Sequence, residues 1–157
     1  MNGRVQDKVC VVTGAGSGIG RAVALRLAEE GGLVLAADVS VATAQETAQI
    51  AGEAGHLVRA SETDVSDPRQ VTAMVDTAVG WWGRIDVLVN NAGVNLPGLL
   101  HEVTDEVIDR TLDVNVKGQI YGCRAVIPHM LAAGSGSIVN VASVNPGLSV
   151  GLDSERG

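Results

Sequence analysis

The sequence predicts an α/β fold built on a doubly wound parallel sheet with helices on both of its faces. Short apolar runs alternate with helical stretches from one end of the 157-residue chain to the other. These runs are continuous rather than interrupted by polar residues, which is typical of strands buried on both faces of a parallel sheet. Such strand–helix alternation implies right-handed crossovers between parallel strands, and we expect five strands.

The first half of the chain contains three predicted strands and two predicted helices. Residues 9–12 (Val-Cys-Val-Val) form the first apolar run, and a helix over 21–30 follows it and ends at two glycines. A second strand is expected at 33–37, a second helix at 41–54, and a third, weaker strand at 56–60.

The second half adds two helices and two strands. The helix over 67–82 opens on an Asp-Pro pair, with the aspartate as N-cap and the proline in the first helical position. A strand at 85–89 follows it. Thr104 is expected to cap a long helix at 105–133, before a fifth strand at 137–141. We therefore expect the whole chain, 1–157, to form a single domain.

Composition predicts an acidic, aliphatic protein of the cytoplasm. Hydrophobic residues make up 46% of the chain but aromatic residues only 2%, with no phenylalanine, so the core must be aliphatic. Eleven basic and eighteen acidic residues give a net charge of 11 − 18 = −7, which disfavours nucleic acids and anionic membranes as partners. The N-terminus lacks an apolar signal core, and no apolar run approaches the length of a membrane span. Histidines and cysteines have no metal-binding spacing, so no metal site is expected.

A glycine-rich turn, Thr-Gly-Ala-Gly-Ser-Gly-Ile-Gly at 13–20, separates the first strand from the first helix. Glycines here allow a tight turn, the approach of a pyrophosphate to the backbone, and close packing of the helix on the sheet. The N–H groups at the helix start would then face the phosphates. A turn that only reverses the chain is the alternative, but the strand–turn–helix context favours a dinucleotide-binding site of Rossmann type. Its predicted residues are Gly14, Ser17, Gly18, Ile19 and Gly20.

Asp38 closes the second predicted strand, beside this turn. A carboxylate there binds the hydroxyls of the adenosine ribose and repels a 2′-phosphate. Neither Ser17 nor Val39 offers a basic side chain to such a phosphate, so NAD(H) is favoured over NADP(H). The alternative for Asp38 is an ordinary loop carboxylate that caps the next helix.

From Lys8 to about Ser143, the chain resembles the short-chain dehydrogenase/reductase (SDR) family of NAD(P)-dependent alcohol and carbonyl oxidoreductases. The resemblance rests on the T-G-x-x-x-G-I-G turn, the Asp-Val pair at 64–65, the Asn-Asn-Ala-Gly sequence at 90–93, Asn115 and Ser143. These motifs follow one another in the family's order, at strand ends where such folds bind ligands.

The resemblance implies further contacts with the cofactor. The side chain of Asp64 and the backbone of Val65 would contact the adenine, and Asn91, Ala92 and Gly93 would line the cofactor cleft. Taken singly, Asp64 could instead be a helix cap and Asn91 a turn residue. In the family the long helix, here 105–133, helps to build an oligomer interface, so the resemblance also implies a homo-oligomer.

Two catalytic residues are implied and two are missing. Asn115 would bend the long helix locally and order a water, and Ser143 would hydrogen-bond the substrate oxygen, although it could also be an ordinary loop hydroxyl. The family's proton donor is a tyrosine in a Tyr-x-x-x-Lys pattern shortly after this serine, but residues 144–157 contain neither Tyr nor Lys. The one tyrosine, Tyr121, lies inside the long helix and has Ala125 four positions on.

We therefore expect a truncated SDR-type, NAD(H)-dependent oxidoreductase of an alcohol or ketone that is inactive alone. Residues 152–157 bear no family resemblance, as if the reading frame had shifted. The alternatives are a non-catalytic dinucleotide-binding module that associates with full-length relatives, and a truncation product that does not fold stably. The fifth strand should be an exposed sheet edge. The long helix should expose an apolar patch made of Ile108, Leu112, Val116, Ile120, Val126, Ile127 and Met130.

Overall fold

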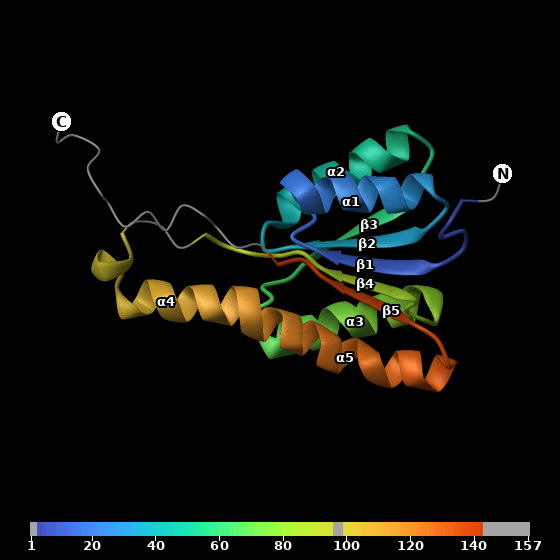
Figure 1. Ribbon diagram of the computed structural model, residues 1–157. Helices are drawn as coiled ribbons and strands as arrows, with labels where there is room; N and C mark the ends of the chain where they lie inside the picture. Colours follow the sequence, from blue (N-terminus) through green and yellow to red (C-terminus); the bar gives the residue numbers. More distant parts are fainter. Residues whose placement is uncertain (1–2, 96–98, 143–157) are drawn as a thin grey trace, which may run out of the picture.

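Five parallel strands form one sheet in the computed structural model, which describes residues 3–95 and 99–142 (Figure 1). The strand order is β3-β2-β1-β4-β5, so the chain winds outward from β1 in both directions and the predicted doubly wound sheet is confirmed. The order reverses between β1 and β4, and in such sheets a crevice opens at this switch point, at the carboxyl ends of the strands. The strands are β1 (Val9–Thr13), β2 (Leu33–Asp38), β3 (Val58–Glu62), β4 (Val87–Asn90) and β5 (Ser137–Asn140).

Helices cover both faces of the sheet. One face carries α1 (Gly18–Glu29) and α2 (Val41–Glu53), and the other carries α3 (Pro68–Trp82) and α5 (Gly118–Ala133) (Figure 1). A short 3₁₀ helix, η1 (Leu100–Glu102), precedes α4 (Asp105–Leu112), which joins α5 through the π-helical segment η2 (Asp113–Lys117). Together α4, η2 and α5 form a long rod that extends past the end of the sheet (Figure 1).

Several element boundaries differ from the prediction by one or more residues, and β4 begins at Val87 rather than at residue 85. The first helix begins at Gly18 rather than at residue 21, because the last glycines of the turn are already helical. The third strand lies two residues further along than 56–60, because it pairs residue by residue with β2 and this pairing, not the apolar run, sets its ends. The helix expected at 105–133 is interrupted by the π-helical segment η2. This segment contains Asn115, the residue predicted to bend the helix.

The two predicted helix caps have different outcomes. Asp67 accepts a hydrogen bond from the Arg69 N–H at 2.9 Å, and Pro68 begins the helix, as predicted. Thr104 occupies the N-cap position of α4, but its hydroxyl makes no capping hydrogen bond. The start of α4 is instead favoured by Asp105 and Glu106, whose negative charges lie in its first turn.

The core is aliphatic and divided by the sheet. Alternate residues of β1 point to opposite faces, so Val9 and Val11 pack with the α3–α5 side while Cys10 and Val12 pack with the α1–α2 side. Burial, with Asp86 nearby, raises the pKa of Cys10 to about 12, so this thiol is a small core residue rather than a nucleophile. The α1–α2 side is rich in alanine, which lets helices approach the sheet closely: Ala24, Ala28, Ala36 and Ala51.

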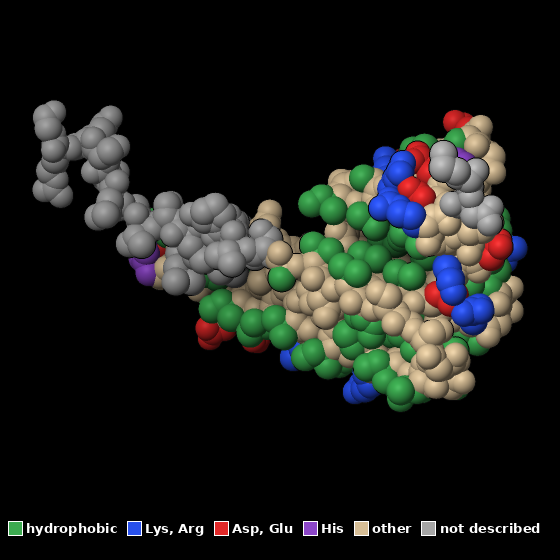
Figure 2. All heavy atoms as spheres, turned by 45° about the vertical axis from the view of Figure 1, so that its right-hand side comes forward, with side chains coloured by type: hydrophobic (Ala, Val, Ile, Leu, Met, Phe, Trp, Pro, Cys, Tyr) green, Lys and Arg blue, Asp and Glu red, His purple; other side chains and the backbone are tan. Residues whose placement is uncertain are grey.

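The outer face of the α4–α5 rod is apolar, although two of its predicted members are not exposed. Figure 2 shows hydrophobic side chains along this rod. Val126 and Met130 are buried, at 0% and 7% exposure, because they lie on the face of α5 that packs against the core. Five predicted residues are 36–56% exposed: Ile108, Leu112, Val116, Ile120 and Ile127. The fifth strand lies at the sheet edge with Val139 exposed. Within residues 3–95 and 99–142, no helix is both long and apolar enough to cross a membrane.

A buried carboxylate ties the start of β4 to β1. Asp86 is 6% exposed, accepts a hydrogen bond from the Val9 N–H at 2.9 Å, and forms ion pairs with Arg84 and with Lys8, whose Nζ is 3.5 Å away. Burial opposes the ionisation of Asp86, but the Val9 N–H and the Arg84 guanidinium outweigh it and hold its pKa below the usual value.

We expect Asp86→Ala to lower the free energy of unfolding by about 1–3 kcal/mol, because the Val9 N–H would be buried without an acceptor. Since the pKa of Asp86 is lower in the folded state, its stabilisation is complete above the unfolded pKa of about 3.9 and is lost as the pH falls through the folded value. Urea unfolding at neutral and acid pH measures both effects. The control is Asp76→Ala, which removes an exposed carboxylate from α3. Equal unfolding free energies for the two variants at neutral pH would contradict the prediction.

Candidate functional site

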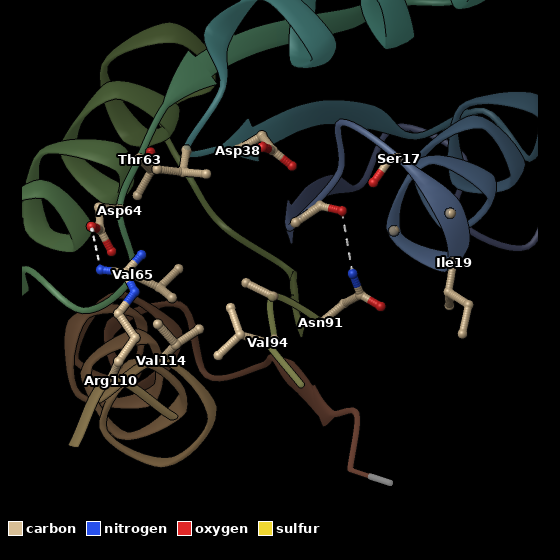
Figure 3. Close-up of a pocket in the computed structure, with 16 residues that line it drawn as sticks. Ser17, Ile19, Asp38, Thr63, Asp64, Val65, Asn91, Val94, Arg110 and Val114 are labelled. Atoms are coloured by element: carbon tan, nitrogen blue, oxygen red, sulfur yellow. Dashed lines mark hydrogen bonds and ion pairs between the residues drawn. The ribbon is translucent and has the colours of Figure 1, made fainter. Parts of the chain in front are cut away.

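The carboxyl ends of β1 to β4 surround a pocket of about 370 Å³ (Figure 3). This volume lies within the range of small-molecule binding sites. The glycine turn forms one wall of the pocket, and the ends of β2 and β3 form a second. The loop after β4 and one face of the α4–η2 helix form a third. The lining residues are Gly14, Ser17, Gly18, Ile19, Gly20, Asp38, Val39, Thr63, Asp64, Val65, Asn91, Ala92, Gly93, Val94, Arg110 and Val114.

The backbone around Gly14 and Gly20 leaves no room for a Cβ atom. Gly14 has φ +64°, and a Cβ on it would lie 2.8 Å from the Cα of Ala92. A Cβ on Gly20 would overlap the carbonyl oxygen of Gly14 and the amide nitrogen of Asn91. Because neither glycine has a Cβ atom, α1 can begin at the pocket wall, and its first residues line the cavity. The positive end of the helix dipole is therefore directed at the pocket, as an anion-binding site requires.

Asp38 joins the glycine turn to the start of the next helix. Its Oδ2 accepts a hydrogen bond from the Gly16 N–H at 2.8 Å, and its Oδ1 accepts one from the Ser40 N–H at 3.0 Å. The N-cap of α2 is Ser40, which accepts from the Thr43 N–H, so capping is not the main role of Asp38. A carboxylate accepts up to about four hydrogen bonds, so the two backbone contacts leave acceptor sites facing the pocket.

Thr13 and Asn91 lock the loop after β4 onto the glycine turn. The hydroxyl of Thr13 accepts hydrogen bonds from the N–H groups of Asn91 and Ala92 at 3.0 and 3.1 Å, and donates to the Val89 carbonyl at 3.5 Å. The side-chain nitrogen of Asn91 donates to the Thr13 carbonyl at 3.0 Å and to the Gly14 carbonyl at 3.4 Å. The second of these bonds is the dashed line at Asn91 in Figure 3. Asn91 therefore fixes the pocket wall, beyond forming a turn.

Asp64 and Arg110 close the far end of the pocket. The hydroxyl and N–H of Ser66 donate to Oδ1 of Asp64 at 2.6 and 2.9 Å, and Nη1 of Arg110 lies 3.9 Å from Oδ2. Ser66 and, more weakly, Arg110 hold the pKa of Asp64 below its usual value, although partial burial opposes them. Asp64 is thus an ionised pocket residue, and the cap of α3 is Asp67. Val65 and Val114 supply the apolar surface beside them (Figure 3).

Asn115 holds the loop after β4 from the helix side. Its Oδ1 accepts from the Val94 N–H and its Nδ2 donates to the Val94 carbonyl, both at 2.8 Å. It lies in the middle of the π-helical segment, so the helix is locally irregular at this residue. Asn115 therefore acts on the pocket through Val94, which lines it.

All eleven predicted cofactor residues line this one pocket, which brings together side chains from five separate stretches of the chain. Ser143 and the tail 144–157 lie outside the described residues. Five lining residues were not among those predicted: Val39, Thr63, Val94, Arg110 and Val114. Arg110 and Val114 carry a usable signal, because residues spaced i and i+4 share one face of a helix, here the face that meets the pocket.

A doubly wound sheet with a glycine turn at its switch point and a carboxylate at the end of the second strand defines a dinucleotide-binding protein of Rossmann type. A family model, the short chain dehydrogenase, matches residues 8–151. The chain therefore belongs to the short-chain dehydrogenase family.

Individual relatives agree with this assignment. The 2-(R)-hydroxypropyl-CoM dehydrogenase of Xanthobacter autotrophicus is 45% identical over 142 residues, which cover 88% of this chain and 57% of that protein. The 3-oxoacyl-[acyl-carrier-protein] reductase of Thermotoga maritima is 40% identical over 92% of this chain and 61% of its own length. A crystal structure of an SDR from Burkholderia phymatum in complex with NAD superposes with a TM-score of 0.86 at 39% identity, covering 88% of this chain and 50% of that one. The chain thus spans between half and two thirds of these relatives' lengths.

Proposed function

We propose that the chain is the NAD(H)-binding part of an SDR-type oxidoreductase that acts on an alcohol or ketone. The observation that carries the proposal is the meeting of the glycine turn and Asp38 at one pocket, where Asp38 binds the turn directly. The names of the two relatives, a hydroxyalkyl dehydrogenase and an oxoacyl reductase, support alcohol–carbonyl chemistry. The NAD complex of the similar crystal structure supports the cofactor class. We further propose that 1–157 forms a single NAD(P)-binding domain.

The residues present fit a dinucleotide. Pyrophosphate would be held by backbone N–H groups of the turn, whose missing Cβ atoms leave room for its approach. Asp38 would accept hydrogen bonds from the ribose hydroxyls and repel a 2′-phosphate, which favours NAD(H) over NADP(H). Asp64 and Val65 would bind the adenine. The segment Asn91-Ala92-Gly93 would line the remaining cleft. When bound, the dinucleotide supplies the hydride donor or acceptor.

Proton transfer is the step for which these residues lack a donor. A ketone that gains a hydride also needs a proton at its oxygen, and a positioned acid contributes about 10²–10⁴ in rate. Ser143, through its hydroxyl, is proposed to bind that oxygen. Tyr121 lies in α5 beside Arg124, whose guanidinium carbon is 5.1 Å from the ring centroid, and it does not line the pocket. The residues after Ser143 in these 157 contain no Tyr-x-x-x-Lys.

We expect the 157-residue polypeptide to bind NADH more tightly than NADPH and to turn over neither alcohols with NAD nor ketones with NADH. Binding should raise the unfolding midpoint with ligand concentration, because a ligand that binds only the folded state stabilises it by mass action. Thermal unfolding with and without each dinucleotide, together with absorbance assays on a panel of substrates, measures both parts. Turnover by the purified polypeptide would refute the missing-donor argument, and a midpoint insensitive to NADH would refute the binding site.

Self-association through the outer face of the α4–α5 rod is part of the proposal. An exposed apolar patch on a water-soluble protein commonly marks an interaction surface. Here the exposed Ile108, Leu112, Val116 and Ile120 follow one another at four-residue spacing along the rod, and the family resemblance assigns an oligomer interface to the same helix.

A further inference from the structure

Arg21 is not a pocket residue, yet it binds the backbone of the turn that forms the pocket wall. It lies in α1 with a side chain that is 27% exposed. Its Nη2 donates to the Gly16 carbonyl, to the Thr43 carbonyl at 3.4 Å and to the Glu46 carboxylate at 2.9 Å. Its Nε donates to the hydroxyl of Thr47 at 3.1 Å. One guanidinium therefore connects α1, α2 and the glycine turn.

Thr47 extends this contact to the preceding peptide unit. It is fully buried, and its hydroxyl donates to the Ala15 carbonyl at 2.8 Å. The other end of the Ala15–Gly16 peptide unit is also held, because the Gly16 N–H donates to Asp38. Side chains thus bind two consecutive peptide units of the turn. The Ala15–Gly16 unit is held at its C=O and at its N–H, and the Gly16–Ser17 unit is held at its C=O.

The direction of these contacts orients the next N–H group. In a trans peptide unit the C=O and the N–H point in opposite directions. Arg21 binds the Gly16 carbonyl on the side of α2, so the N–H of the same peptide unit, which belongs to Ser17, points away from α2. Ser17 lines the pocket (Figure 3). The carbonyl contact therefore fixes the direction of an N–H group on a residue that lines the pocket, where a phosphate would bind.

We propose that Arg21, supported by Thr47, is a positioning residue that holds the glycine turn in its pyrophosphate-binding conformation before the dinucleotide arrives. This inference rests on the proposed NAD(H) function and adds a residue outside the pocket to it. A turn held in advance does not lose conformational freedom on binding, and that saving appears as affinity for the ligand. Arginine suits the role because its planar fork of five donors reaches several acceptors at once, whereas lysine offers a single ammonium group.

The test compares Arg21→Met with Arg26→Met in the 157-residue chain. Arg26 lies on the same helix and also pairs with carboxylates, Glu29 and Glu30, but at the end of α1 remote from the turn. We expect Arg21→Met to weaken NADH and ADP, which carry a pyrophosphate, by about tenfold, the equivalent of one lost charge-assisted hydrogen bond. Adenosine, which has no phosphate, should bind both variants and the unchanged protein equally. Titrations followed by fluorescence for NADH and by NMR for ADP and adenosine measure this.

Two further variants separate positioning from folding. Thr47→Val removes only the buried hydroxyl and should weaken NADH in the same direction, and it applies the same test if Arg21→Met does not fold. Arg21→Lys should restore part of the affinity. Unchanged NADH affinity in Arg21→Met, or an equal loss for NADH and adenosine, would overturn the inference while leaving the proposed function intact. An unchanged protein that binds neither NADH nor ADP would overturn the proposed function and this inference with it.

Discussion

Gly20→Ala is expected to weaken NADH binding more than about tenfold and to destabilise the fold by about 1–3 kcal/mol or more. The added Cβ would overlap the Gly14 carbonyl oxygen and the Asn91 amide nitrogen, and it would lie 2.7 Å from the Gly14 carbonyl carbon. Backbone on one side and a hydrogen-bonded amide on the other leave the methyl group no space. The glycine turn and the loop after β4 must then separate, and the pocket between them changes shape.

The control for this prediction is Gly80→Ala. Gly80 lies within α3, and a Cβ there meets no atom within 4 Å. Alanine is the better helix former, so this variant should gain up to about 1 kcal/mol and bind NADH normally. Urea unfolding and NADH titration of both variants provide the measurement. If Gly20→Ala binds NADH as tightly as Gly80→Ala does, the close packing inferred at the turn is wrong.

Asp38→Asn is expected to change the choice of cofactor. The amide keeps an oxygen for the Gly16 N–H, but the negative charge that would face a 2′-phosphate is gone. Because the juxtaposition of like charges costs several kcal/mol, we expect the NADPH-to-NADH affinity ratio to rise by about 10–100-fold. Most of the rise should come from tighter NADPH binding, with a smaller loss of NADH affinity from the weaker contact to the ribose.

Glu62→Gln is the matched control for Asp38→Asn. Glu62 pairs with Asp38 across the sheet, at the end of the neighbouring strand, but it is exposed and does not line the pocket. Glu62 therefore carries the same negative charge as Asp38 and lies at the paired position of the neighbouring strand. Competitive titration of each variant with NADH and NADPH yields the two ratios. Equal changes in both would assign the effect to net charge and refute a specific role for Asp38.

Most of the fold could be predicted because its signals are local. Continuous apolar runs mark β1 and β2, an Asp-Pro pair marks the start of α3, and glycines mark the turns. The ends of β3 could not be predicted in this way, because its partner strand sets them. Val126 and Met130 were assigned to the wrong face for a related reason, since hydrophobicity alone does not say which side of a largely apolar helix meets the core.

The candidate site was predictable where residues follow a strand end in sequence, as Asp38, Asp64 and Asn91 do. Arg110 and Arg21 were missed because their roles depend on contacts across the fold. Arg110 reaches Asp64 from a helix 46 positions later in the chain, and the guanidinium of Arg21 reaches the Gly16 carbonyl. The sequence around Arg21 carries no local signal that separates such a contact from an ordinary surface charge, whereas Arg110 shares its helix face with Val114.

The bonds between Thr13 and Asn91 constrain the order in which the newly made protein can mature. They join residues 78 positions apart, and the sheet pairs residues of β1 and β4 that are 77 positions apart. Ribosomes add about 5–20 residues per second, so about 4–16 s separate the synthesis of the two partners. During that interval β1 lacks one of its two neighbours and the turn lacks Asn91. A nascent chain therefore completes its dinucleotide pocket only after Asn91 is made, although the glycine motif leaves the ribosome well before that residue.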